Sequence, residues 1–164
     1  EHFLTRLFTM ASFREFKKEP SMKGLVDFHT NNKLLFMAFS QETMRELGRI
    51  TANPEKQSLE HVIGSYEVLM RKMLASMPRF TAWINVLQHA FGFISDGLEK
   101  EEKELFVNSI EEYRDERIPL STLIKLLKSY ALRFNEDYLL RQTFLNPFPL
   151  DLVKITDSGQ GRKL

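Results

Sequence analysis

The stretch that most constrains the fold is residues 81–98, TAWINVLQHAFGFISDGL. On a helix of roughly 3.6 residues per turn, its apolar side chains cover about half of the circumference. The other stripe is uncharged until Asp96 and consists of Asn85, Gln88, His89 and Gly92. Because stripes that face solvent usually carry Lys and Glu, the pattern predicts a central helix with a half-buried polar stripe, at which Gly92 lets another backbone or a ligand come close.

Helical spacing of apolar residues recurs along most of the chain, and no alternation of period two is long enough for a sheet. Ser21 and Ser40 stand where helix N-caps are expected, another helical segment begins at Ser58, and prolines 20, 54 and 78 interrupt the pattern. Met77 and Leu105 fall on the inward faces of their segments. The sequence therefore predicts an all-α single bundle of about seven helices. Besides 81–98, the helical segments are 3–16, 21–39, 40–50, 58–77, 99–116, 119–134 and 137–145.

Composition narrows the classes of function. A chain of 164 residues with 43% apolar content suits one domain with one core. Its net charge of +1 gives no bulk field for nucleic acid or an anionic membrane, so such binding must be local. The absence of cysteine excludes disulfides and thiolate ligands for zinc or an iron–sulfur cluster within this chain. No apolar run is long enough to span a membrane and no signal peptide is evident, so we expect a cytoplasmic location and no membrane partner.

Two pairs of cationic or imidazole side chains are candidates for a site. His29 and Lys33 lie four residues apart on one side of their segment. Lys33 either extends its stem along the core with its ammonium in water, or forms a partly desolvated cation beside an imidazole, suited to an anion or a polar ring. Arg45 and Arg49, one turn apart among glutamates, form either a solvated ladder of charges or a contact to an anionic ligand.

Motifs for most catalytic chemistry are absent. The chain has no phosphate-binding loop, dinucleotide fingerprint, zinc-protease helix or nucleophile elbow. His29 and His89 are on separate segments, so a metal site would need a carboxylate beside them. Neighbouring acids such as Glu101 and Glu102 lie on a charged outer face. We therefore predict no catalytic residue and no metal ligand.

Five segments in order resemble the YbgA-like domain of unknown function. They are LVDFHTNNKLLFMAFS (25–40), RELGRITA (45–52), INVLQHAFGF (84–93), EEYRDERIPL (111–120) and YLLRQTFLNPFP (138–149). The resemblance implies an all-helical domain that often follows an iron–sulfur domain of the thiouracil-desulfidase type. Any iron–sulfur cluster would then belong to that N-terminal domain, and this chain would hold no cofactor.

The resemblance also divides the chain. Residues 1–20 resemble the amphipathic connector from a preceding domain, which would explain the missing initiator methionine. Residues 21–153 are expected to form the YbgA-like domain, and residues 154–164 to form a disordered tail. Departures from the family pattern are Met44, Trp83 and Ser129, where members often carry tyrosine or histidine. The polar motif positions carried over are His29, Lys33, Arg45, Gly48, Asn85, Gln88, His89, Gly92, Arg114, Gln142 and Pro147.

Two hypotheses about function follow. In the first, the domain is an accessory binding module of a sulfur-removing protein and holds a nucleobase, nucleotide or RNA. Its ligand-binding candidates are His29, Lys33, Arg45, Asn85, Gln88 and His89. In the second, the same residues form a buried network, and the domain docks a partner or forms a homodimer through residues 3–16. A free-standing hydrolase or lyase using His29 and Lys33 is a third hypothesis, which lacks an accompanying nucleophile or metal set.

Overall fold

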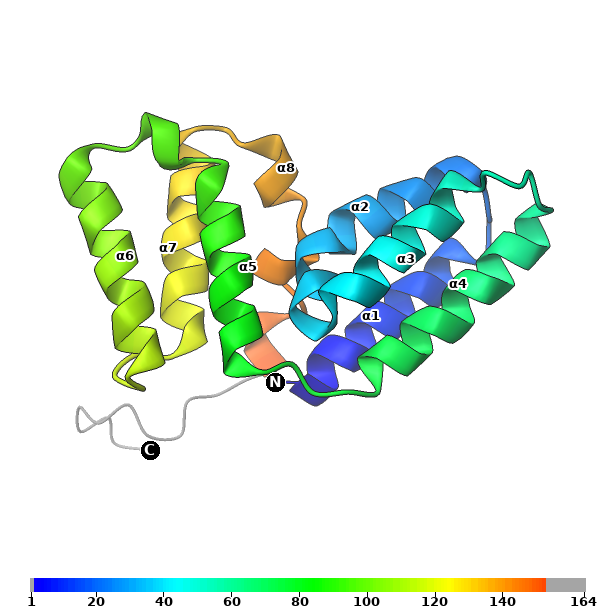
Figure 1. Cartoon of the computed structure of the whole chain (residues 1–164), viewed down its shortest axis with the longest axis horizontal. Helices are drawn as coiled ribbons and strands as arrows, with labels where there is room; N and C mark the ends of the chain where they lie inside the picture. Colours follow the sequence, from blue (N-terminus) through cyan, green and yellow to red (C-terminus); the bar gives the residue numbers. More distant parts are fainter. Residues whose placement is uncertain (1, 153–164) are drawn as a thin grey trace.

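The computed structural model describes residues 2–152 and confirms the all-α prediction (Figure 1). It has eight α-helices, seven of them at least seven residues long, and no strand within the described residues. The predicted tail at 154–164 lies outside the described residues. The elements are α1 (His2–Phe16), α2 (Met22–Phe39), α3 (Gln41–Ala52), α4 (Leu59–Leu74), α5 (Phe80–Gly92), η1 (Ser95–Gly97), α6 (Lys100–Arg114), α7 (Leu120–Arg133), α8 (Asp137–Leu140), η2 (Thr143–Leu145) and η3 (Leu150–Leu152).

Two helices begin at the serine caps that the sequence predicts, and a third, which starts where predicted, also has a serine cap. The hydroxyl of Ser21 accepts a hydrogen bond from the Gly24 amide at 3.0 Å, and that of Ser40 accepts from Thr43 N at 3.1 Å. Ser58 does the same at the start of α4. Each cap satisfies an amide that has no carbonyl partner in the first helical turn, so local chemistry determines where α2, α3 and α4 begin.

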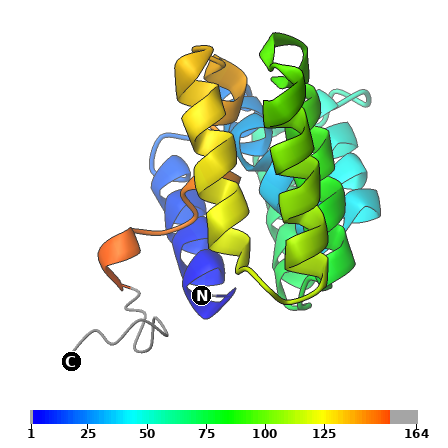
Figure 2. The ribbon, with the colours of Figure 1, turned by 90° about the vertical axis from the view of Figure 1, so that its left-hand side faces the viewer.

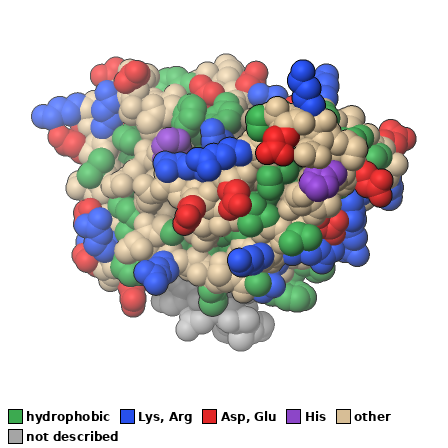
Figure 3. Space-filling view, turned by 45° about the vertical axis from the view of Figure 1, so that its right-hand side comes forward, with side chains coloured by type: hydrophobic (Ala, Val, Ile, Leu, Met, Phe, Trp, Pro, Cys, Tyr) green, Lys and Arg blue, Asp and Glu red, His purple; other side chains and the backbone are tan. Residues whose placement is uncertain are grey.

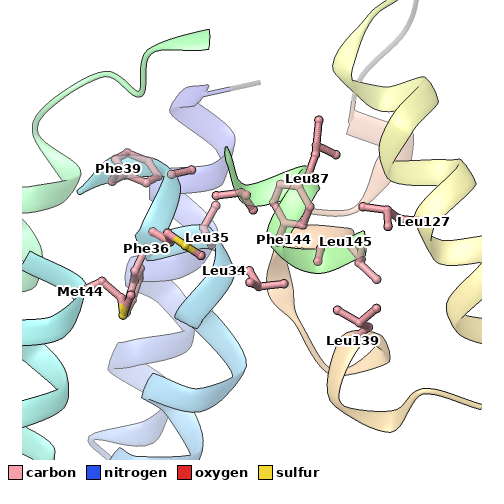
Figure 4. Packing of buried hydrophobic residues seen from close by; sticks show 14 of the residues in the cluster. Leu34, Leu35, Phe36, Phe39, Met44, Leu87, Leu127, Leu139, Phe144 and Leu145 are labelled. Atoms are coloured by element: carbon pink, nitrogen blue, oxygen red, sulfur yellow. The ribbon is translucent and has the colours of Figure 1, made fainter. Parts of the chain in front are cut away.

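The helices form two groups that share one core. Helices α1–α4 lie on one side and α5–α8 on the other, with α2 and α5 in contact between them (Figures 1 and 2). Buried side chains of α2, including Leu34 and Leu35, point toward Leu87 of α5 and Phe144 of η2 (Figure 4). Ten of the 18 residues in α2 are buried, against four of 13 in α5. The most enclosed helix is therefore α2, and the prediction that 81–98 forms the central helix is wrong in that respect.

Residues 81–98 also do not form one continuous helix. Helix α5 ends at Gly92, and a short turn leads to η1. Of the two glycines in this stretch, Gly97 is the one that another group approaches closely, since a Cβ there would lie 2.8 Å from the Phe134 ring. A Cβ at Gly92 would meet nothing within 4 Å. Gly97 therefore lies close against the Phe134 ring, and the buried residues Ile94 and Leu98 lie after the end of α5 rather than on it.

Three other predicted helical segments also differ from the structure in their ends or in their buried faces. Helix α4 ends at Leu74, which leaves Met77 outside it and 76% exposed. Leu105, predicted to face inward on α6, is 55% exposed because Phe106, Ser109 and Ile110 form the buried face instead. The predicted helix 137–145 is divided into α8 and η2 at Gln142. No helix within residues 2–152 is long and apolar enough to cross a membrane.

Helix α1 packs onto this core with part of its apolar surface. Thr5, Thr9 and Phe13 are buried, and Phe13 contacts the rings of Phe28 and Tyr66 at centroid distances of 5.1 and 5.8 Å. The other apolar side of α1 remains in solvent, with Phe3 72% exposed. The helix thus belongs to the α1–α4 group, and the assignment of residues 1–20 to a connector from another domain stays a prediction.

Candidate functional site

A pocket of about 450 Å³ opens between α2, α3 and α5. Four of the six predicted ligand-binding residues line it, namely His29, Lys33, Arg45 and His89. The remaining lining residues are Leu34, Met37, Gln41, Met44, Gly48, Arg49 and Ala52.

Helical periodicity explains why α2 and α3 supply most of this lining. His29, Lys33 and Met37 recur every four residues on α2, and Gln41, Arg45 and Arg49 do so on α3. Such spacing places each set in one row along its helix. The two rows face a common space because α3 follows α2 after the single residue Ser40 and packs against it.

The rim of the pocket is cationic. Lys33, Arg45 and Arg49 are all exposed, and none of them forms an ion pair with any residue in the described part of the chain. No aspartate or glutamate lines the pocket. Figure 3 shows a row of Lys and Arg side chains beside a histidine on one face of the molecule. Unpaired cations around a concave surface attract anions more strongly than the net charge of the chain suggests.

His29 forms the floor of the pocket. Its side chain is 8% exposed, and its Nδ1 lies 3.1 Å from the hydroxyl oxygen of Tyr66 on α4. Burial, followed by the positive charge of Lys33, lowers the pKa of His29 from 6.5 to about 4. The imidazole is therefore neutral at neutral pH. Burial also raises the pKa of Tyr66 well above its ordinary value, so the phenol keeps its proton.

The stripe on α5 is not half-buried as the sequence predicts. Asn85, Gln88 and His89 are all exposed, and neither Asn85 nor Gln88 lines the pocket. The buried side of α5 is the apolar one, formed by Ile84, Val86, Leu87 and Ala90. Of these three residues His89 lines the pocket, and its ring lies against that of Phe93 at a centroid distance of 5.8 Å. An uncharged stripe on this helix is therefore compatible with exposure to solvent.

Sequence reasoning missed two residues of the site. Arg49 is not among the ligand-binding candidates predicted from the sequence, although its spacing of four from Arg45 indicates a shared row. Tyr66 reads as an ordinary core residue, because nothing in its local pattern reveals a partner 37 positions away. Lys33 is exposed, as expected for a snorkelling lysine, yet it also lines the pocket.

A second polar cluster lies elsewhere on α2, where Gln142 joins it to the C-terminal segment. The Gln142 side chain is 2% exposed; its Oε1 accepts from Leu34 N at 3.0 Å and its Nε2 donates to Thr30 O at 2.8 Å. Thr143 Oγ1 donates to Asn32 Oδ1 at 2.8 Å, and Asn32 Nδ2 donates to Phe28 O at 2.8 Å. We call Gln142, Thr143 and Asn32 the amide joint.

The amide joint explains why the last predicted helix is interrupted. Thr30 O and Leu34 N are four residues apart, the spacing that a helix pairs internally. Both arms of the Gln142 amide bind these two groups, so the chain around Gln142 must approach α2 closely and side-on. A continuous helix from 137 to 145 does not form, and η2 packs against α2 instead.

Metal chemistry has no evident centre here. Within residues 2–152, no three His, Cys, Asp or Glu side chains gather in a group that could hold a metal ion. His29 and His89 line the same pocket, but the lining adds no carboxylate to them. The chemistry that the pocket offers is hydrogen bonding and charge, from three cations, two imidazoles and one amide.

Comparisons with known proteins place the chain in a family but assign no activity. It is 26% identical over 158 residues to the uncharacterized protein YbgA of Escherichia coli (strain K12), across 95% of this chain and 93% of that protein. No solved structure matches it. Residues 33–149, more than two thirds of the chain, match the family described as protein of unknown function (DUF1722). The chain therefore belongs to the DUF1722 family and is similar to YbgA.

Proposed function

We propose that this domain is a binding module for phosphate-bearing ligands of the nucleotide or RNA class, and that it serves as an accessory to a sulfur-removing, desulfidase-type protein. The observation that carries the proposal is the set of three cations around one pocket, Lys33, Arg45 and Arg49, none with an ion-pair partner in the described part of the chain. Exposed arginines and lysines without acidic partners are suited to phosphate oxygens, because guanidinium groups bind them in a forked geometry.

The remaining lining supports a ligand larger than a lone phosphate. Met37 and Met44 are buried and offer apolar contact, and Gln41 and the two imidazoles offer hydrogen bonds. A volume of about 450 Å³ is within the range of small-molecule sites. A nucleotide unit, alone or within RNA, combines a phosphate with a flat polar ring and so matches both parts of the lining. The desulfidase-type partner domain and its iron–sulfur cluster rest on the resemblance alone.

The test is the binding of a fluorescently labelled single-stranded RNA of about ten nucleotides, followed by anisotropy over a range of salt concentrations. The variant Arg45→Gln/Arg49→Gln should bind at least about tenfold more weakly than the wild type. The slope of log affinity against log salt should become shallower by about 1.4, because each phosphate contact to a single strand contributes about 0.7.

The matched control is Arg14→Gln/Arg79→Gln, which removes the same charge from two exposed arginines outside the pocket. If affinity depends only on total charge, both double variants will lose affinity equally. That result, or unchanged binding in Arg45→Gln/Arg49→Gln, would contradict the proposal.

The alternative function is docking or dimerisation, and one observation favours it. Helix α1 begins beside the α4–α5 connection (Figure 1), and both segments carry exposed apolar side chains. Phe3 is 72% exposed, Met77 76% and Phe80 55%. Analytical ultracentrifugation of Phe3→Ser/Leu7→Ser against the wild type tests it, since a dimer through α1 would dissociate. Surface substitutions are preferable to removing α1, because Phe13 belongs to the core.

A further inference from the structure

The floor of the cationic pocket has a feature that charge alone does not explain. His29 is buried, neutral at neutral pH and lines the pocket, with one ring nitrogen committed to Tyr66. Resting on the function proposed above, we propose that His29 selects among phosphate-bearing ligands. Its Nε2–H, oriented by the Tyr66 hydroxyl and left uncovered by Gly48, donates a neutral hydrogen bond to a carbonyl oxygen on the ring of the bound nucleotide.

The hydrogen bond to Tyr66 determines which ring nitrogen carries the proton. Tyr66 is fully buried, and His29 Nδ1 at 3.1 Å is the one hydrogen-bond partner of its hydroxyl among the described residues. If Nδ1 carried the proton, the phenolic hydrogen would be left without an acceptor among aromatic rings, and a buried unsatisfied donor is costly. If the phenol donates to Nδ1, both groups are satisfied. The second arrangement places the imidazole hydrogen on Nε2.

Gly48 keeps that nitrogen open. A Cβ built at Gly48 would lie 3.3 Å from His29 Nε2 and 3.9 Å from Cε1, with no other atom within 4 Å. Any larger residue at position 48 would therefore cover Nε2. Because Gly48 also lines the pocket, the space that its missing side chain leaves is continuous with the ligand volume. A glycine in the middle of a helix weakens the helix, so its presence here needs a reason such as this one.

Charge and donor are thereby separated in space. The exposed cations at the rim bind phosphate, whereas the buried floor presents one uncharged N–H. A ring carbonyl can accept a hydrogen bond from this N–H. An amino group at the same point cannot, because two hydrogen-bond donors would then face each other. Leu34, Met37 and Met44 flank the floor with buried apolar surface suited to the face of a ring. The uracil base of uridine carries two ring carbonyls, so uridine 5′-monophosphate is a suitable probe. Ribose 5-phosphate is the matching ligand without the base.

The experiment measures the dissociation constants of both probes by calorimetry for the full chain and its variants. We expect His29→Leu to weaken the binding of uridine 5′-monophosphate about five- to tenfold and that of ribose 5-phosphate less than twofold. His29→Gln, whose amide can donate from near the position of Nε2, should retain most of the preference. Equal losses for both probes, or a His29→Gln variant that behaves as His29→Leu does although its Tm is that of the wild type, would overturn the assignment.

A glycine pair supplies a matched control. Gly48→Ala should weaken the binding of uridine 5′-monophosphate by about the same factor as His29→Leu does, because the alanine methyl group covers His29 Nε2. Gly64→Ala makes the same change in α4, where a Cβ would meet nothing within 4 Å, and should leave both affinities unchanged. If Gly48→Ala binds both probes as the wild type does, the uncovered nitrogen has no role.

The tautomer itself is measurable without any ligand. Long-range proton–nitrogen NMR spectra of the His29 ring should show Nε2 protonated in the wild type and a mixture of tautomers in Tyr66→Phe. Protonation at Nδ1 in the wild type would overturn the inference even if the pocket binds nucleotides. If the wild type binds neither probe, the proposed function fails together with this inference, whatever the tautomer.

Discussion

The amide joint and the cationic pocket both place polar side chains against α2, but they differ in what those side chains bind. In the amide joint, Gln142 is 2% exposed and both ends of its amide are hydrogen-bonded to the α2 backbone. In the pocket, Arg45 and Arg49 are exposed and have no partner in the described part of the chain. Polar groups that are paired and buried hold elements together, and unpaired groups around a concavity remain available to a ligand.

His29 belongs to the pocket but shares one property with the amide joint, since it is buried and bonded to Tyr66. The sequence predicted either a binding site or a buried network for one and the same set of candidate residues. In the structure the exposed cations line the pocket, and a separate network, the amide joint, lies elsewhere on α2. Predictions about stability and binding can separate these places.

The largest expected effect is a loss of stability in acid through His29. Its pKa is about 4 in the folded protein and about 6.5 when unfolded, so the unfolded chain binds more protons between these values. Stability should therefore be fully present above pH 6.5 and fall as the pH drops toward 4. The 2.5-unit difference corresponds to about 3 kcal/mol at 1.36 kcal/mol per unit.

Urea denaturation of wild type and His29→Gln between pH 4 and 7 measures this effect. The difference between the two curves isolates His29 from carboxylates such as Glu67, whose pKa is lowered by its hydrogen bond with Lys17 and which is present in both proteins. Parallel curves would show that His29 is not buried as described. The amide joint contains no titratable group and should not contribute to this pH dependence.

The next effect tests the amide joint directly. Gln142→Ala removes two buried hydrogen bonds, each worth about 1 kcal/mol, and leaves a small cavity. We expect a loss of about 2 kcal/mol, since two such hydrogen bonds are removed. Urea denaturation at pH 7 gives the value.

The control for this prediction is Gln88→Ala, which removes the same kind of amide from an exposed position on α5. Its effect should stay within about 0.5 kcal/mol. Equal effects at positions 88 and 142 would show that Gln142 does not join η2 to α2. RNA affinity of Gln142→Ala, measured where the variant is folded, should equal that of the wild type.

The smallest expected effect is on the cations. Arg45→Gln/Arg49→Gln should change the free energy of unfolding by less than about 0.5 kcal/mol, because neither side chain is buried or ion-paired within the described residues. This is the same variant that should lose at least tenfold in RNA affinity. A large loss of stability would indicate that the two arginines stabilise the fold, as the amide joint does, and would count against the proposed function.

Part of the site was readable from the sequence because it depends on local spacing. His29 and Lys33 recur four residues apart, as do Arg45 and Arg49, and these rows are what α2 and α3 contribute to the pocket. The prediction that Asn85 and Gln88 are half-buried is wrong, since an uncharged stripe indicates composition and not burial. Met77 and Leu105 failed because an apolar residue near a helix end, or beside a better-packed neighbour, remains in solvent.

The sequence by itself determined the class of fold, the starts of α2, α3 and α4 and the rows of polar residues along them. Serine caps and helical periodicity act within a few residues, so they are visible without the rest of the chain. Only the tertiary structure decided that Tyr66 binds His29, that Gly48 uncovers it, and that Gln142 spans the backbone of α2 more than 100 positions away. These contacts depend on packing between distant elements, and no local pattern of residues encodes such a partner.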